Sequence, residues 1–257
     1  MRNLCVILAD QLNQEITSLN DFDKDLDEIL ICELKKNFTD INHHKKKIVY
    51  QISCMRHFGL EMKALGFKIN YLRLDDPNKK NSYASKIKEL INEKGIERVI
   101  VTEASSYKEM ESIKRWKGII GRDVEIRKND LFMCDKQEFE AWAKGRKELR
   151  LEFFYRMLRK KHNVLMDENQ PEGGAWNFDK KNRKPLANKV SIPKTYSCIA
   201  DKETLDVINL VNNEFSDHFG STDNFLFGVT RSDALEALNQ FIKERLINFG
   251  DYQDAMT

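Results

Sequence analysis

Polar side chains stand at the ends of three apolar runs with the length of buried strands, residues 4–9, 28–32 and 98–102. The carboxyl ends of parallel strands meet at one edge of an open sheet, where ligands bind. We therefore expect a polar rim made of Ala9, Asp10, Gln11, Cys32, Glu33, Thr102 and Glu103. Carboxylates and amides suit an uncharged heterocycle or a ribityl chain. The alternative is that Asp10 only caps a loop.

A phosphate-bearing ligand is disfavoured at this rim. Neither GxGxxG nor GxxxxGKS/T occurs in the chain, so no glycine-rich loop is available to cradle phosphates. The sequence HHKKK at residues 43–47 precedes a helical pattern and has two interpretations. It is either a solvated helix start, or His44 turns into the rim. Adjacent histidines do not chelate one metal from a single helix face, and we predict no metal site.

A second group of residues suits nucleic acid, because cations meet phosphates while rings and amides meet bases. Trp176 and Phe178 precede a run of basic and amide side chains, and a basic helical pattern lies upstream. The candidate contacts are Lys160, Lys161, Lys180, Lys181, Asn182, Arg183 and Lys184. The alternative is a solvated basic linker.

The charge distribution supports this interpretation. The 257 residues carry a formal net charge of +2, which by itself gives no reason to expect nucleic acid. Residues 144–194, however, hold 14 basic and 6 acidic side chains, whereas residues 195–257 hold 4 basic and 11 acidic ones. The middle segment therefore attracts phosphate electrostatically, and the tail does not.

Other functional classes are not indicated. No Ser–His–Asp, Cys–His or paired-carboxylate arrangement stands out, so we nominate no catalytic residue. The 5 cysteines are dispersed, which indicates a reduced, cytoplasmic chain without clustered metal ligands. No apolar run approaches the roughly 20 residues of a membrane span, and the N-terminus does not resemble a signal peptide.

The elements that must position these residues alternate between strands and helices. Strands are expected at 4–9, 28–32, 67–74, 98–102 and 124–126, with helices at 47–65, 85–93 and 107–118 between them. This alternation predicts an α/β fold with a doubly wound, parallel, five-stranded sheet of Rossmann-like type. A long connector and C-terminal helices follow.

The rest of the chain shows helical patterns at 136–144, 148–161, 205–211 and 232–247. Ser232 is the predicted N-cap of the last of these helices, whose apolar stripe needs a covering partner. We divide the chain into an α/β domain at 1–134, a basic connector at 135–200 and the start of a helical domain at 201–257.

Several motifs occur in an order that is specific when they are taken together. They are ILADQLN at 7–13, HHKKK at 43–47, MRHF at 55–58, AKGRKELRLEFFYRMLRKK at 143–161, QPEGGAWNFDKKNRKP at 170–185 and FGDYQDAM at 249–256. Over essentially its whole length the sequence resembles the deoxyribodipyrimidine photolyase-related proteins, the group of iron–sulfur bacterial cryptochromes and (6–4) photolyases.

The resemblance implies a light-driven flavoprotein. Members join an α/β antenna domain, which can hold 6,7-dimethyl-8-ribityllumazine, to a helical domain that binds FAD and a 4Fe–4S cluster. The excited reduced flavin passes an electron to a DNA lesion. Asp10, Gln11, Cys32 and Glu33 match the antenna-pocket strand ends, and His44 the adjoining helix start. Ala9 replaces a frequent glycine, and Asn182 and Arg183 match the lesion-facing connector.

The resemblance also shows what this sequence lacks. A full member is about twice as long, and the flavin pocket and cluster cysteines belong to the other half. We expect this N-terminal portion to bind the antenna and contact damaged DNA, without repairing it unless the FAD-binding half joins in cis or in trans. The alternatives are a stand-alone chromophore-binding or nucleic-acid-binding module, or a component of a blue-light photoreceptor.

Overall fold

The computed structural model describes residues 2–77, 80–179, 182–186 and 191–253. The chain forms two compact units. Unit 1 comprises Met1–Leu131 with Ser197–Asp233, and unit 2 comprises Phe132–Tyr196 with Ala234–Thr257. None of the helices in the described ranges has the length and apolar character needed to cross a membrane.

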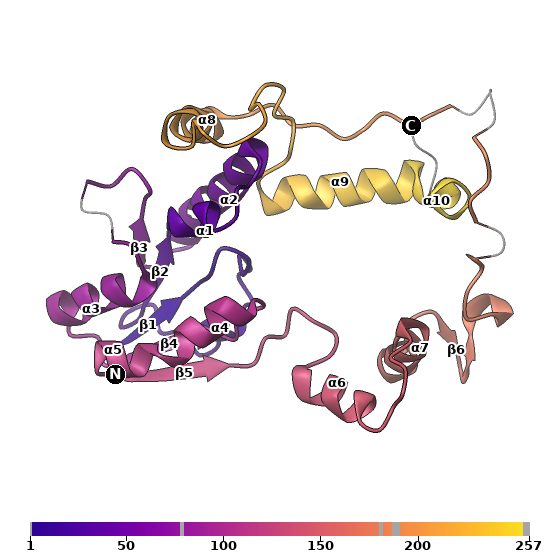
Figure 1. Ribbon diagram of the computed structural model, residues 1–257, viewed down its shortest axis with the longest axis horizontal. Helices are drawn as coiled ribbons and strands as arrows, with labels where there is room; N and C mark the ends of the chain where they lie inside the picture. The colour runs from indigo at the N-terminus through magenta and orange to yellow at the C-terminus, as the bar shows by residue number, and fades with distance from the viewer. Residues whose placement is uncertain (1, 78–79, 180–181, 187–190, 254–257) are drawn as a thin grey trace. The chain divides into compact units, whose positions relative to one another are not determined.

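Unit 1 is built on a five-stranded parallel sheet in the order β3-β2-β1-β4-β5 (Figure 1). The strands are β1 (Asn3–Val6), β2 (Glu28–Cys32), β3 (Ile69–Leu72), β4 (Arg98–Thr102) and β5 (Asp123–Arg127). β1 pairs with β2 on one side and with β4 on the other, so the strand order reverses there. The predicted doubly wound α/β fold is confirmed, and its switch point lies between β1 and β4.

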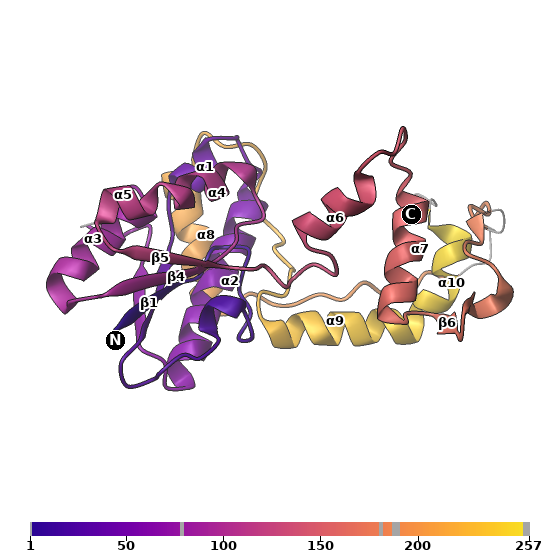
Figure 2. The ribbon, with the colours of Figure 1, turned by 90° about the horizontal axis from the view of Figure 1, so that it is seen from below.

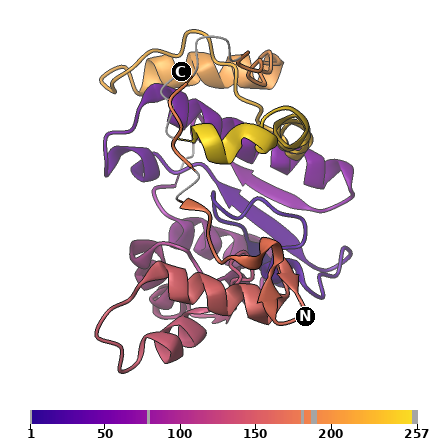
Figure 3. The ribbon, with the colours of Figure 1, turned by 90° about the vertical axis from the view of Figure 1, so that its right-hand side faces the viewer.

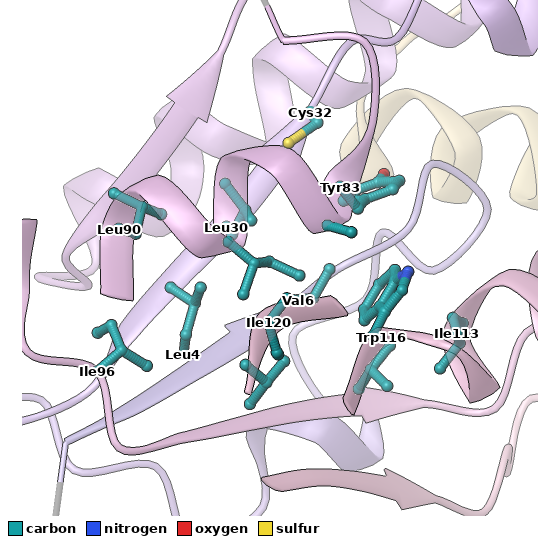
Figure 4. Close-up of a cluster of buried hydrophobic side chains, with 14 of the residues drawn as sticks. Leu4, Val6, Leu30, Cys32, Tyr83, Leu90, Ile96, Ile113, Trp116 and Ile120 are labelled. Carbon is teal, nitrogen blue, oxygen red and sulfur yellow. The ribbon is translucent and has the colours of Figure 1, made fainter. Parts of the chain in front are cut away.

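Helices cover both faces of the sheet because the central residues of the buried strands are apolar: Leu4–Val6 in β1, Ile29–Cys32 in β2 and Val99–Val101 in β4. Leu4 and Val6 pack with α3 (Tyr83–Lys94), α4 (Tyr107–Lys114) and α5 (Trp116–Ile120) on one face (Figure 4). Cys5 and Ile7 point the opposite way, against α2 (Lys45–Ala64) and the short helix η1 (Thr17–Leu19). Because successive side chains along each strand point to opposite faces, the sheet has a separate hydrophobic core on each face.

A further helix covers the outer face of α2. Val207 and Val211 of helix α8 (Lys202–Glu214) share a buried cluster with Ile48 and Ile52 of α2, and the short helix α1 (Lys36–Thr39) adds Phe38. Figures 2 and 3 show orange α8 beside α2, on the side of α2 away from the sheet. The chain therefore leaves unit 1 near residue 131 and returns to it near residue 197.

Serine caps place the first turns of two helices at the carboxyl edge of the sheet. The Ser82 hydroxyl accepts a hydrogen bond from the Ser85 backbone N–H at 3.2 Å and begins α3. Ser106 accepts one from the Glu109 N–H at 3.1 Å and begins α4. Each cap satisfies a backbone donor that the helix leaves unpaired, so each fixes where its helix starts.

Unit 2 has little buried interior. It contains α6 (Lys136–Ala143), α7 (Leu151–His162), the hairpin of β6 (Met166–Asp167) and β7 (Gln170–Pro171), η2 (Glu172–Gly174), most of α9 (Arg231–Glu244), and α10 (Leu246–Tyr252). Among its described residues only Arg159 and Pro171 are buried. The apolar stripe of α9 and α10 is about half exposed, at Leu235, Leu238, Ile242 and Leu246.

Two details of the predicted helices were wrong. The helix expected at 107–118 is interrupted at Arg115, and the one expected at 232–247 is interrupted at Arg245. The N-cap of α9 is Thr230 instead of Ser232: its hydroxyl accepts from the Asp233 N–H at 3.1 Å, and the Asp233 carboxylate accepts from the Thr230 N–H at 3.0 Å. This reciprocal capping box satisfies two backbone donors, the N–H groups of Thr230 and Asp233, which a Ser232 cap alone would not do.

The boundaries at 134 and 200 stay a prediction. Helix α8, which we assigned to the start of a helical domain, packs on α2 in unit 1.

Candidate functional site

A cleft of about 590 Å³ opens in unit 1 at the carboxyl ends of β1 and β2. Its walls also include the first turns of α3 and α4, which follow β3 and β4. The cleft therefore lies beside the switch point of the sheet, where the doubly wound topology creates a crevice.

The floor of the cleft is apolar and aromatic. The rings of Tyr83 and Trp116 lie side by side, with centroids 5.8 Å apart, and Ile113 adjoins them (Figure 4). Both aromatic side chains are almost fully buried, because their other sides belong to the core beneath the sheet. A rigid apolar floor of this kind suits the ring system of a small ligand.

Polar groups converge above this floor. The buried Tyr83 hydroxyl has no hydrogen-bond partner among the described residues. Asp10 and Glu109 line the same cleft. Burial raises the pKa of Glu109, and the nearby Asp10 carboxylate raises it further. Burial also raises the pKa of Tyr83 well above its usual value, so its hydroxyl keeps its proton.

Basic side chains occupy the outer part of the cleft. Lys36, Lys47 and Arg115 line it, and Lys108 forms an ion pair with Asp40. His43 lines it too, and burial, helped by Lys47 and His218, lowers the pKa of His43. The cleft is thus acidic near the strand ends and basic towards α1 and α2.

Two of the predicted rim residues, Ala9 and Asp10, line the cleft. Gln11 follows them directly but is buried, and its amide donates to the backbone carbonyls of Thr102 at 3.3 Å and Glu103 at 3.2 Å. The Thr102 hydroxyl in turn accepts from the Ser18 N–H at 2.9 Å. These side chains hold the loops after β1 and β4 together and are not brought to the cleft.

The side chains of Cys32 and Glu33 are also buried and contact other parts of unit 1 instead of the cleft. Cys32 belongs to the core of the sheet, and burial raises the pKa of its thiol. Glu33 forms a bidentate ion pair with Arg56, at 2.7 and 3.1 Å, and accepts from the Tyr71 hydroxyl and the Leu74 N–H, both at 2.8 Å. This carboxylate has no free acceptor site pointing at the cleft.

His44 caps α2 instead of entering the cleft. Its Nδ1 accepts from the Lys46 N–H at 3.0 Å, and its ring packs edge-on against Phe219. The rest of HHKKK also binds the loop after α8: the Lys45 N–H donates to the Phe219 carbonyl at 3.1 Å. The motif therefore joins α2 to the returning segment.

Sequence reasoning missed Tyr83 and Glu109. Each lies in the first turn of a helix that follows a strand: Tyr83 comes directly after the capping Ser82, and Glu109 comes three residues after the capping Ser106. A serine after a strand and before a helical pattern was the available signal, because helix starts at this edge of the sheet face the crevice.

In unit 2, three cations surround one aromatic ring. The guanidinium carbons of Arg156 and Arg159 and the Lys160 ammonium lie 5.3, 5.4 and 5.3 Å from the centre of Trp176. Arg156 also forms an ion pair with Glu152 and Arg159 is buried, so Lys160 is the exposed cation of the three. Arg159 also donates to the Val164 carbonyl at 3.1 Å, which fixes the hairpin to α7.

The predicted nucleic-acid contacts are placed differently from one another. Lys160 is exposed beside Trp176, and Arg183 is exposed with a left-handed backbone. Lys161 pairs with Glu138 at 2.7 Å and Lys184 with Asp251 at 2.8 Å, while Asn182 lies beside Gly250. Lys180 and Lys181 lie outside the described residues. Within the part of the chain that the structure describes, no three or more His, Cys, Asp and Glu side chains gather as a metal site.

The comparison with known families decides the relationship of this sequence. The profile of the deoxyribodipyrimidine photo-lyase-related proteins matches residues 5–227. The chain belongs to this family. The match includes the cleft, the basic helix α7 and the returning helix α8.

Two relatives show how much of a member is present. A (6-4) photolyase from Agrobacterium fabrum is 41% identical over 256 residues, which is all of this chain and 50% of that protein. The chain thus spans about half of that relative, its N-terminal half. An uncharacterized protein of Acanthamoeba polyphaga mimivirus is 25% identical over 201 residues, which is 75% of this chain and 99% of the viral protein.

Proposed function

We propose that this photolyase-related chain holds an antenna chromophore and contacts damaged DNA, as part of a light-dependent repair flavoprotein of the (6-4) photolyase type. One observation carries the antenna role: the cleft at the switch point combines the aromatic side chains of Tyr83 and Trp116 with the carboxyl groups of Asp10 and Glu109. An apolar surface with a few polar groups is typical of a site for a small ligand.

The proposed ligand is 6,7-dimethyl-8-ribityllumazine. Its flat ring matches the floor of Tyr83 and Trp116, and its ribityl chain carries hydroxyl groups for the polar side. Ala9 and Asp10 would contact it. Gln11, Glu33, Thr102 and Glu103 would shape the cleft from behind through the hydrogen bonds described above, Cys32 through its place in the core, and His44 through the cap of α2.

The DNA-facing role is assigned to unit 2. Arg156, Arg159 and Lys160 concentrate positive charge on one ring, and Arg183 and Lys184 follow in the connector. Phosphate contacts of this kind give affinity without reading sequence. The same surface keeps Trp176 partly exposed, as a ring on which a base could stack.

Repair itself would require the other half of the protein, in cis or in trans. That half would bind FAD and an iron–sulfur cluster, and the reduced flavin would supply the electron. The half-exposed stripe of Leu235, Leu238, Ile242 and Leu246 is the surface that it would cover. The nearly coreless unit 2 supports this, because such a unit is poorly stabilised alone.

The antenna role is tested by titrating the lumazine into the purified chain and following its fluorescence. Ala9→Phe should abolish binding by filling the cleft. Ala64→Phe, the same change at an exposed position of α2, should leave binding unchanged. An unmodified chain that gives no fluorescence or absorption change with the lumazine would contradict the antenna role.

The DNA role is tested separately with the double variant Arg183→Ala/Lys184→Ala. We expect weaker binding to a lesion-containing duplex and a shallower dependence of log K on log salt, by up to about two phosphate contacts. Lys63→Ala/Lys88→Ala, on exposed helix positions of unit 1, is the matched control. If the dependence of log K on log salt has the same slope for both variants, the connector does not contact DNA.

A stand-alone chromophore-binding module is the second candidate. The viral relative favours it, since the aligned region accounts for 99% of that protein. Such a module would bind the lumazine equally well with and without a flavin-containing helical partner, and it would show no affinity for that partner. Co-purification with that partner in a pull-down would speak against it.

A further inference from the structure

The loop after α8, residues 216–224, is bound to the start of α2 within unit 1. The backbone N–H of Lys45 donates to the Phe219 carbonyl at 3.1 Å, and the Lys45 ammonium donates to the Ser216 carbonyl at 3.2 Å. Phe215, which comes directly before the loop, is buried in the cluster that joins α8 to α2. We call residues 216–224 the clasp loop, because these contacts hold the end of α8 against α2.

Three histidines lie at this contact, and each has its Nδ1 atom in a hydrogen bond. His44 Nδ1 accepts from the Lys46 N–H at 3.0 Å and so caps α2. His43 Nδ1 lies 3.3 Å from the Lys47 ammonium. His218 belongs to the clasp loop and is 7% exposed, and its Nδ1 lies 2.9 Å from the His43 carbonyl.

The partners of the three rings fix their protonation. An ammonium group and a backbone N–H can only donate, so Nδ1 of His43 and Nδ1 of His44 carry no proton, and both rings are neutral with the proton on Nε2. A carbonyl can only accept, so Nδ1 of His218 carries a proton whether that ring is neutral or charged. The contact therefore requires neutral His43 and His44 and tolerates a charged His218.

Basic groups lie near the two neutral rings. They come from the same turn, from the clasp loop and from α1, and they are Lys45, Lys46, Lys47, His218 and Lys36. Burial, then Lys47, then His218 lowers the pKa of His43 below its ordinary value of 6.5. A proton gained by either ring would remove an acceptor and would also add a positive charge to this basic group.

The acidic groups on the neighbouring elements do little to offset that charge. Glu214 at the end of α8 pairs with Lys35, and Asp40 after α1 pairs with Lys108. The clasp loop carries two carboxylates of its own, at positions 217 and 223, and both residues are exposed. Because solvent screens exposed carboxylates, they stabilise a charged histidine only weakly.

We propose that His43 and His44 make the clasp loop an acid-sensitive switch, in which protonation of the two rings releases the loop from α2. The contribution of His43 to the contact is present above its ordinary pKa of 6.5 and is lost as the pH falls through its lowered pKa. Release would also change the wall of the cleft, which His43 and Lys47 line. The switch does not depend on which ligand the cleft holds.

Amide hydrogen exchange of the 257-residue chain at pH 7.5 and pH 5.0, corrected for the intrinsic rates, tests the switch. Protection of residues 43–50 and 215–224 should fall about tenfold at the lower pH, the ratio expected when a helix cap and a second hydrogen bond are lost. Protection of β1 and β4 should change by less than about twofold, because the sheet does not take part in the switch.

The double variant His43→Asn/His44→Asn keeps an acceptor near each Nδ1 position, since the amide oxygen accepts hydrogen bonds but does not titrate in this range. It should lose the difference in protection between the two pH values. His162→Asn, at an exposed position of unit 2, is the matched control and should keep the full difference.

Nitrogen-15 NMR of the imidazole rings adds a measurement that needs no variant. At pH 7.5 the rings of His43 and His44 should carry their proton on Nε2, and Nδ1 of His218 should be protonated. A proton on Nδ1 of His43 or His44 at this pH would overturn the switch, even if the double variant does not fold.

Three exchange results would also overturn it. They are equal protection of the unmodified chain at both pH values, the same loss of protection in the double variant, and a loss that extends equally to β1 and β4. The last would mean that acid unfolds unit 1 as a whole instead of releasing the clasp loop.

Discussion

Replacing Glu33 should test whether this residue serves the fold or the ligand. Its carboxylate is buried and accepts four hydrogen bonds, two from Arg56 and one each from the Tyr71 hydroxyl and the Leu74 N–H. Removing one member of a buried ion pair costs roughly 3–5 kcal/mol, because the other charge stays desolvated. Arg56 keeps Glu203 at 3.1 Å and Asp75 at 3.6 Å, which offsets part of that cost.

We therefore expect Glu33→Ala to lower the free energy of unfolding by about 3 kcal/mol. The double variant Glu33→Leu/Arg56→Met removes both buried charges and should be more stable than Glu33→Ala alone, since Glu203 and Asp75 keep Arg73 as a partner at 3.3 Å. Glu15→Ala, at an exposed position, should change stability by less than about 0.5 kcal/mol.

Urea unfolding followed by far-ultraviolet circular dichroism measures all three variants. A midpoint that moves without a change in slope reports stability itself. The reasoning is refuted if Glu33→Ala loses less than about 1 kcal/mol, or if the double variant is the less stable of the two. Loss of lumazine binding by fully folded Glu33→Ala would return this residue to the ligand rim.

Three further outcomes are expected. Partial burial alone would raise the pKa of Asp201, but hydrogen bonds from the Thr204 N–H and His57 lower it from 3.8 to about 2. The contribution of Asp201 to stability is therefore complete above pH 4 and is lost as the pH falls towards 2. Asp201→Asn should flatten the acid unfolding curve between these pH values, and parallel curves for the variant and the unmodified chain would count against this link. Gly220→Ala should lower the free energy of unfolding by about 2 kcal/mol or more, because a Cβ there meets the His44 ring and φ is +83°. Gly66→Ala, with φ of +85° and open space around it, should lower it by about 1 kcal/mol from the backbone alone. Equal unfolding midpoints of the two variants in urea would contradict the close contact at Gly220. Leu238→Glu on the exposed stripe should change the free energy of unfolding of this chain in urea by less than about 0.5 kcal/mol, because the side chain is half exposed. A loss above about 2 kcal/mol would mean that the stripe is already covered.

The sheet could be predicted from the sequence because its signals are local. Leu4 and Ile29 belong to apolar runs with the length of a strand covered on both faces, and helical periods separate these runs. The same alternation predicted a ligand rim at the carboxyl ends of the strands, where Ala9 and Asp10 line the cleft, whereas the strand order and the switch point between β1 and β4 required the structure.

The side-chain partners could not be predicted, because they depend on residues far apart in sequence. Glu33 at a strand end has the same appearance whether it faces a ligand or, as here, Arg56 on the buried side of α2. Val207 and Val211 form an apolar face that gives no indication of which helix it covers. The pairing of α8 with α2 therefore required the structure.

The return of the chain to unit 1 has a consequence for synthesis on the ribosome. Ile48, Ile52 and Phe38 are buried by Val207, Val211 and Phe215, more than 150 residues later in the chain. Until that segment has left the exit tunnel, α2 carries an uncovered apolar surface while unit 2 is already being made. The nascent chain is thus open to aggregation and to chaperone binding during this interval, and the α/β unit completes its folding only after most of the chain has been translated.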